Sequence, residues 1–183
     1  MHFINESTIS SADCDTLIDY FKNKKEEGRA FPGMCGDCEI DPKIKKSTDV
    51  HITQELHSFF SGLIQKSLDE YIERFPFCNY YSKWAILVDP LIQHYAPNDG
   101  FYAWHTERCG ATKNQCNRHL VYMVYLNDVT DGGGTEFYHQ NLVVQPVKGK
   151  VLIWPADWTY THRGIPSPTQ EKYIVTGWFE YME

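Results

Sequence analysis

The chain has 183 residues, of which 42% are hydrophobic and 15% aromatic, and its formal net charge is −7. The length suits one domain with a sizeable core, and the composition excludes a disordered chain. The acidic balance disfavours nucleic acid as a partner, because proteins that bind duplex DNA are more often basic. The sequence shows neither a signal peptide nor an apolar stretch long enough to cross a bilayer. We therefore expect a soluble, cytoplasmic protein without a membrane partner.

The first 80 residues or so are predicted to be a helical support. Ser10 or Ser11 suits the N-cap of a first helix, because a hydroxyl can accept a hydrogen bond from the first turn. Residues 28–41 hold four glycines or prolines and are expected to form a loop, whose glycines would permit the motion of a lid. A second helix is expected over about residues 53–74, where apolar residues recur at helical spacing: Leu56, Phe60, Leu63, Ile64, Leu68, Tyr71 and Ile72.

From about residue 84 the pattern changes to short β-branched and aromatic runs separated by turn residues. Strands are predicted over residues 85–95, 119–126, 135–138, 143–145, 150–154 and 173–181. This spacing is typical of an antiparallel sandwich or barrel. We therefore predict an α+β fold with an all-β core. Residues 1–183 would form a single domain, with helical support over about 1–80 and the β-core over about 84–183.

Six cysteines are present: Cys14, Cys35, Cys38, Cys78, Cys109 and Cys116. Without a secretory signal, free thiols are expected. The spacing of Cys35 and Cys38 resembles half of a zinc site, but no second pair follows at zinc-finger spacing. Cys109 and Cys116 flank a polar loop, and the sequence leaves open whether they pair.

The principal candidate site begins with His105 and Glu107. In an extended segment, residues two apart point to the same face, so these side chains can share a cation. Adding His162 completes the two-histidine, one-carboxylate set that suits non-haem Fe(II) and leaves three positions open for a chelating co-substrate and dioxygen. A zinc hydrolase could use the same ligands, but its helical HExxH signature is absent.

Lys172 and Tyr95 are candidates for binding an anionic co-substrate. Lys172 opens the last β-like run, ten residues beyond His162. A buried anion needs a cation to offset its desolvation, and Lys172 could supply one. Tyr95 ends the strand that leads towards His105, and its hydroxyl could donate to the same carboxylate.

The ordered set of these motifs resembles the prolyl 4-hydroxylase-like branch of the 2-oxoglutarate/Fe(II) oxygenase superfamily. The resemblance covers about residues 84–181. It rests on IQHYAPNDGFYAWHTE (92–107), RHLVYMVYLN (118–127), GGGTEF (132–137), PVKGKVLIWP (146–155), HRG (162–164) and KYIVTGW (172–178).

The resemblance implies a double-stranded β-helix, a jelly-roll type of barrel, braced by N-terminal helices. It implies a dioxygenase that couples decarboxylation of 2-oxoglutarate, to succinate and carbon dioxide, to substrate hydroxylation. Its cofactors would be Fe(2+), 2-oxoglutarate and O2, with ascorbate as an accessory. His105, Glu107 and His162 would act as the catalytic metal ligands, and Lys172, assisted by Tyr95, would bind the distal carboxylate of 2-oxoglutarate.

The sequence departs from the branch at Glu107, where the usual residue is Asp. A glutamate remains a hard oxygen ligand, so we expect iron binding to persist, while the metal position and substrate scope are less defined. His119, beside Arg118, is interpreted as structural or as supporting the ligands, because the set of three is already complete.

The substrate implied by the resemblance is a prolyl residue in a peptide or protein. A free amino acid, another small metabolite and, less favoured, a nucleobase are alternatives, and a non-catalytic cupin-like barrel is the alternative of another class. The oligomeric state is not predicted. Aromatic residues expected near the barrel mouth could stack on a proline ring: Tyr81, Tyr102, Trp104, Trp154 and Trp158. The predicted substrate-binding set is Tyr102, Trp104, Arg118 and Trp178.

Overall fold

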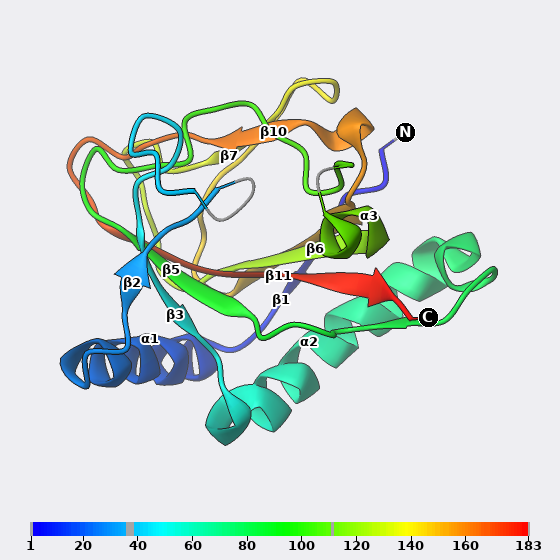
Figure 1. Ribbon diagram of the computed structural model, residues 1–183, viewed down its shortest axis with the longest axis horizontal. Helices are drawn as coiled ribbons and strands as arrows, with labels where there is room; N and C mark the ends of the chain where they lie inside the picture. The colour runs from blue at the N-terminus through cyan, green and yellow to red at the C-terminus, as the bar shows by residue number, and fades with distance from the viewer. Residues whose placement is uncertain (1, 36–38, 111, 183) are drawn as a thin grey trace.

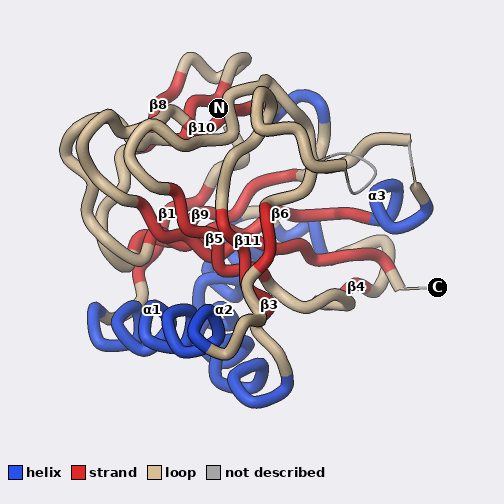
Figure 2. Tube along the Cα trace, turned by 60° about the vertical axis from the view of Figure 1, so that its left-hand side comes forward, coloured by secondary structure: helices blue, strands red, loops and turns tan. Residues whose placement is uncertain are grey.

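The computed structural model describes residues 2–35, 39–110 and 112–182, and within them two antiparallel sheets lie face to face (Figures 1 and 2). The large sheet has the order β1 (Asn5–Thr8), β9 (Lys150–Pro155), β6 (Arg118–Tyr125), β11 (Lys172–Tyr181), β5 (Leu91–Tyr95), β3 (Thr48–His51) and β2 (Phe31–Pro32), with β4 (Trp84–Ala85) also paired to β11. The small sheet has the order β10 (His162–Gly164), β7 (Thr135–Phe137) and β8 (Leu142–Val144). This is the jelly-roll architecture that was expected.

Two helices, α1 (Ser11–Glu26) and α2 (Gln54–Arg74), cover the outer face of the large sheet, on the side away from the small sheet (Figure 2). The α1 helix begins as predicted, because the Ser10 hydroxyl accepts a hydrogen bond from the Asp13 backbone at 3.1 Å. The remaining helical segments are short: η1 (Pro76–Asn79), α3 (Lys113–Asn117) and η2 (Trp158–Tyr160). None of the described helices is both long enough and apolar enough to span a membrane.

Strand β6 separates two hydrophobic cores. Its residues Leu120, Tyr122 and Val124 pack with the helices, and the alternating residues Val121, Met123 and Tyr125 pack between the two sheets. A strand buried on both faces needs apolar side chains at every position, because successive side chains point to opposite faces. The continuous apolar run of β6 therefore follows from its central place in the sheet.

The predicted helices and the main strands are present, and the N-terminal part also contributes strands that the sequence did not predict. The strands β1, β2 and β3 belong to it and join the large sheet, where β1 pairs with β9 and β3 pairs with β5. All three are short, and β1 and β3 are largely polar, so pairing with a neighbouring strand makes them extended. This pairing across the chain supports our proposal that residues 1–183 form one domain.

Other boundaries differ locally. The predicted strand over residues 85–95 is interrupted between β4 and β5, and neither β10 nor α3 was predicted. The predicted loop over residues 28–41 includes the two-residue strand β2. These elements are too short to show a periodic pattern of their own.

Candidate active site

The backbone itself brings two of the three predicted metal ligands together. His105, in the segment after β5, forms an isolated antiparallel bridge with His162, the first residue of β10. Each backbone N–H donates to the other residue's carbonyl oxygen at 3.0 Å. Because β10 is also paired with β7, the position of His162 is set by the small sheet, and His105 is held to it.

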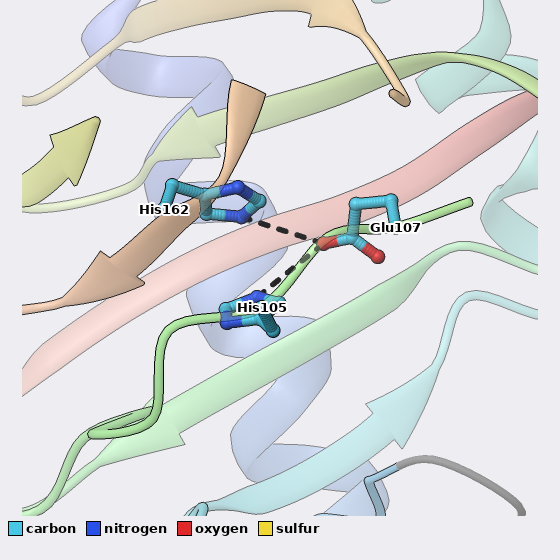
Figure 3. Close-up of side chains that lie close together, drawn as sticks. All are labelled: His105, Glu107 and His162. Atoms are coloured by element: carbon cyan, nitrogen blue, oxygen red, sulfur yellow. Dashed lines mark ion pairs between the residues drawn. The ribbon is translucent and has the colours of Figure 1, made fainter. Parts of the chain in front are cut away.

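The three side chains converge on one space (Figure 3). The Nε2 atoms of His105 and His162 lie 3.6 and 3.5 Å from the same atom, Oε1 of Glu107. One ligand atom of each residue lies within 4.8 Å of those of the other two, and no second group of three such residues occurs in the described part of the chain. The structure therefore brings the predicted set together.

Both imidazoles present a free nitrogen to this space. The Nδ1 atom of His105 lies 3.0 Å from the Ala103 carbonyl oxygen, and the Nδ1 atom of His162 lies 2.9 Å from the Tyr160 carbonyl oxygen. Because a carbonyl oxygen only accepts, each Nδ1 must donate, which leaves the Nε2 lone pair for a metal. Burial and the neighbouring His162 lower the pKa of His105, which favours the neutral imidazole that a metal requires.

Neighbouring side chains contact the second carboxylate oxygen of Glu107. Its Oε2 atom accepts a hydrogen bond from Trp178 Nε1 at 2.9 Å, and Arg118 Nη1 lies 3.4 Å from Oε2 and 2.9 Å from the Glu107 carbonyl oxygen. Burial alone would raise the pKa of Glu107, but interactions with His105 and His162 outweigh it and hold the pKa well below its usual range. The carboxylate is thus ionised, with one oxygen turned towards the imidazoles.

This arrangement changes how two predicted substrate residues are understood. Arg118 and Trp178 stack on each other, with the guanidinium carbon 3.5 Å from the indole centroid, and both contact Glu107. They also line the same cavity as the three ligands. Their observed contacts orient the metal-facing carboxylate, and their contact with substrate stays a prediction.

Lys172 lies within the same cavity, which has a volume of about 380 Å³. The residue is only 4% exposed, and its Nζ donates to the Gly133 carbonyl oxygen at 2.9 Å. Burial lowers the pKa of Lys172 to about 8. No carboxylate within the described residues forms an ion pair with it, so an anionic ligand would supply the counter-charge that burial makes necessary.

Tyr95 lies opposite Lys172 in the pairing of β5 with β11, and its ring centroid is 4.9 Å from Lys172 Nζ. Its hydroxyl, however, donates to Gln93 Oε1 at 2.8 Å. Gln93 Nε2 in turn donates to Asp49 Oδ2 at 3.3 Å, and Lys45 Nζ contacts the same oxygen at 2.9 Å. The Tyr95 proton is therefore engaged within the protein, and contact with 2-oxoglutarate would require it to be redirected.

The sequence reasoning missed this buried chain of polar residues. Lys45, Gln93 and Tyr95 all line the cavity. Gln93 lies two residues before Tyr95 on a predicted strand, so the alternation of side chains could have placed both on one face. Lys45 and Asp49 gave no such signal, because strand β3 was not predicted.

The aromatic residues predicted at the mouth are dispersed. The Tyr102 hydroxyl donates to the Asn98 carbonyl oxygen at 3.0 Å, and Trp104 packs against Tyr138 on the surface. Neither is among the residues that line the described cavity. Trp154 is buried and lines it, whereas Tyr81 and Trp158 are exposed.

The remaining predictions concern His119 and the cysteines. His119 contacts the Cys78 carbonyl oxygen at 2.8 Å and the Tyr181 hydroxyl at 2.7 Å, which agrees with a structural role. The described cysteines are free, which confirms the expectation for them: Cys14, Cys35, Cys78, Cys109 and Cys116. Cys38 lies outside the described residues, so the proposed half-site with Cys35 is not tested.

The chain resembles known proteins in sequence. The family model of the 2OG-Fe(II) oxygenase superfamily matches residues 90–180. A protein of Acanthamoeba polyphaga mimivirus, provisionally named a prolyl 4-hydroxylase, is 22% identical over 195 residues, covering 97% of this chain and 73% of that protein.

Solved structures with the same fold include prolyl hydroxylases. A viral collagen prolyl hydroxylase from Paramecium bursaria Chlorella virus-1, in complex with 2-oxoglutarate, superposes with a TM-score of 0.73 at 22% identity, covering 98% of this chain and 97% of that one. A Pseudomonas putida prolyl 4-hydroxylase gives a TM-score of 0.74 at 18% identity, covering 98% and 94%. The chain belongs to the 2-oxoglutarate/Fe(II) oxygenase superfamily, whose cofactors are Fe(II), 2-oxoglutarate and dioxygen.

Proposed function

We propose that this chain is a dioxygenase that hydroxylates a prolyl residue of a peptide or protein. Fe(II) would be held by His105, Glu107 and His162. The observation that carries the proposal is one cavity that holds both this ligand set and the buried cation of Lys172. This combination suits a dianion. One end of the dianion would chelate the metal, and the cation, which has no carboxylate partner, would neutralise the other end.

The donor set fits the metal. Two neutral imidazoles and one carboxylate on one face are the ligands that non-haem Fe(II) takes in oxygenases. When bound, Fe(II) with dioxygen supplies the oxidising power for decarboxylation of 2-oxoglutarate and for substrate hydroxylation. The protein supplies the orientation. The carbonyls of Ala103 and Tyr160 fix the imidazoles, and Trp178 and Arg118 fix the carboxylate.

Lys172 would bind the distal carboxylate of 2-oxoglutarate. An ammonium group kept from water gains more from an anionic ligand than an exposed one, because neither charge is screened by solvent. Tyr95 would contribute a hydroxyl beside it after its hydrogen bond to Gln93 is exchanged. Both residues come from paired strands of the large sheet, which makes their spacing rigid.

A peptide substrate is supported by the relatives. Besides the collagen prolyl hydroxylase, a Trichoplax adhaerens prolyl hydroxylase in complex with a hypoxia-inducible-factor peptide fragment shares the fold, with a TM-score of 0.75 at 18% identity. The open side of the cavity is bordered by exposed or half-buried residues such as Met34 and Cys109. This leaves an approach for a side chain that projects from a longer chain.

The test is a turnover assay with a proline-containing peptide library, free proline and other free amino acids, each with Fe(II), 2-oxoglutarate and ascorbate. We expect succinate formation together with the addition of one oxygen atom to a prolyl peptide, both abolished by removal of iron. Oxygen added only to a free amino acid would overturn the peptide assignment. Iron loading without succinate formation across the library would overturn the dioxygenase assignment.

A further inference from the structure

A second pocket, with a volume of about 500 Å³, lies at the end of the molecule where α2 ends. Its walls come from the N-terminal segment, the end of α2, η1 and the adjoining ends of β6, β9 and β11. In Figure 1 the chain ends and the η1 region gather on this same side. The lining residues are mainly aromatic or otherwise apolar: Phe3, Tyr71, Phe75, Phe77, Leu120 and Tyr181.

This pocket is separate from the active site, although the two share a wall. Glu107 and Arg118 face the active-site cavity, whereas their chain neighbours Arg108 and His119 line the second pocket. The wall between them is closed by backbone hydrogen bonds, from Arg108 N to the Ala156 carbonyl oxygen at 2.8 Å and from Ala156 N to the His119 carbonyl oxygen at 3.0 Å. A ligand in the second pocket would therefore not reach the metal ligands.

The pocket has a positive charge beside its aromatic walls. Arg108 is paired with Asp157, so these two charges offset each other. Arg74 also lines the pocket, and within the described residues it forms no ion pair. Its Nη1 donates to the neutral Asn5 Oδ1 at 2.9 Å, and its guanidinium lies 5.0 Å from the Phe75 ring centroid. The charged side chains of the lining thus leave an excess of one positive charge.

Aromatic residues are exposed around this charge. Phe77 is 70% exposed and Phe3 is 46% exposed, although both line the pocket. Ligand pockets of several hundred cubic ångströms combine apolar walls with a few polar groups that fix orientation, and this pocket has both features. A planar apolar group would cover the aromatic rings, while an anionic group would face Arg74.

We propose that this second pocket binds a small aromatic monoanion, such as an aryl carboxylate or sulfonate. The charge excess selects an anion over a neutral ligand, and the size and apolar lining select an aromatic body over inorganic phosphate. The site is independent of the proposed function, because none of its lining residues belongs to the metal or co-substrate machinery.

The test uses 8-anilinonaphthalene-1-sulfonate, an aromatic monoanion, and N-phenyl-1-naphthylamine, the same body without the sulfonate, on the folded full chain. We expect the anion to bind with one equivalent per chain, measured by fluorescence and calorimetry. It should bind about three- to tenfold more tightly than the neutral probe, the scale of one charge-assisted contact at a partly exposed site.

Substitutions of Arg74 test whether the anionic probe binds beside this residue. Arg74→Glu should weaken anion binding by about tenfold or more, whereas Arg74→Lys should stay within about threefold of the parent, because it keeps the charge. Binding of the neutral probe should change little in either variant. The Lys172→Met variant and excess 2-oxoglutarate should both leave anion binding unchanged, since they affect the other cavity.

Three outcomes would overturn the proposal. The first is the absence of saturable binding to the folded chain. The second is equal binding of the anion to the parent and to Arg74→Glu. The third is displacement of the probe by 2-oxoglutarate, which would place it in the active site instead.

Discussion

The two faces of the large sheet are built from the same strands but differ in what they bury. On the helix-covered face, Tyr122 packs against Phe60 of α2, and Val124 belongs to the same hydrophobic cluster. On the opposite face, Met123 and Tyr125 line a cavity that also holds the buried ammonium of Lys172.

The difference teaches how one sheet separates stability from chemistry. Buried polar groups cost free energy unless they are paired, so a face that only stabilises the fold buries mainly apolar groups. The Tyr122 hydroxyl is an exception, because it is buried on this face without a hydrogen-bond partner among the described residues. The inner face tolerates Lys172 and the metal ligands because the second sheet encloses a cavity there for their partners. Substitutions on the two faces should therefore have separable effects.

The largest effect is expected from His162→Ala on the inner face. Without this imidazole the metal loses one of three protein ligands, and succinate formation should fall by at least about a thousandfold. The protein should still fold, because the backbone bridge to His105 does not use the side chain. The control is His57→Ala on α2, which should retain turnover. Loss of folded protein in His162→Ala, seen by circular dichroism, would contradict the expectation that the inner face can be changed without unfolding the protein.

Phe60→Ala on the outer face should have the opposite profile. Phe60 is 1% exposed, and its removal leaves a cavity, so we expect the free energy of unfolding to fall by about 3–5 kcal/mol. The neighbouring exposed residue gives a matched control, since Phe59→Ala should cost much less. Denaturant titration measures both. Turnover per folded molecule should equal that of the parent, and a specific loss of turnover would show that the two faces are coupled.

The pH dependence of Lys172 should sharpen the comparison. Its pKa of about 8 lies below the ordinary value of 10.5, so above pH 8 the free protein holds a neutral amine there. Binding a dianion must then take up a proton, and 2-oxoglutarate affinity should fall by up to about tenfold per pH unit above 8.

Without co-substrate, the free energy of unfolding should instead increase with pH. Between about pH 8 and 10.5 the unfolded chain binds more protons at this position than the folded one, so Lys172 should make the free energy of unfolding rise with pH. Calorimetric titration and denaturant unfolding at several pH values measure the two slopes. Lys172→Met should remove both contributions. If this variant showed the same pH slopes as the parent protein, Lys172 would not be the group that titrates.

The smallest effect is expected from Trp178→Phe. The substitution keeps an aromatic ring under Arg118 but removes the N–H that donates to Glu107 Oε2. Loss of such a supporting hydrogen bond should weaken metal binding by about tenfold, with little change in stability. Competition with a coloured chelator under argon measures the affinity for Fe(II) or Mn(II). Trp158→Phe, at an exposed position, is the control and should leave it unchanged.

The strength of local patterns decided which parts of the fold could be predicted. The α2 helix and strand β6 were found because long periodic or continuous apolar runs reflect their burial directly. Strands β1, β3 and β10 were missed, because they are short and polar and owe their extended form to their neighbours. The spacing of two explains why His105 and Glu107 point to one space, because residues two apart in an extended segment share a face. His162 joins them through the backbone bridge to His105, which the sequence did not indicate.

The sequence by itself determined the chemical types of the site: two imidazoles, a carboxylate and a distant lysine, in an order that indicated the family. Only the tertiary structure decided that Trp178 and Arg118 hold the carboxylate, and that Gln93, Asp49 and Lys45 engage the hydroxyl of Tyr95. The physical reason is that these contacts join strands far apart in the chain. Their partners are set by which strands pair and in which register, and no local pattern of residue types records that.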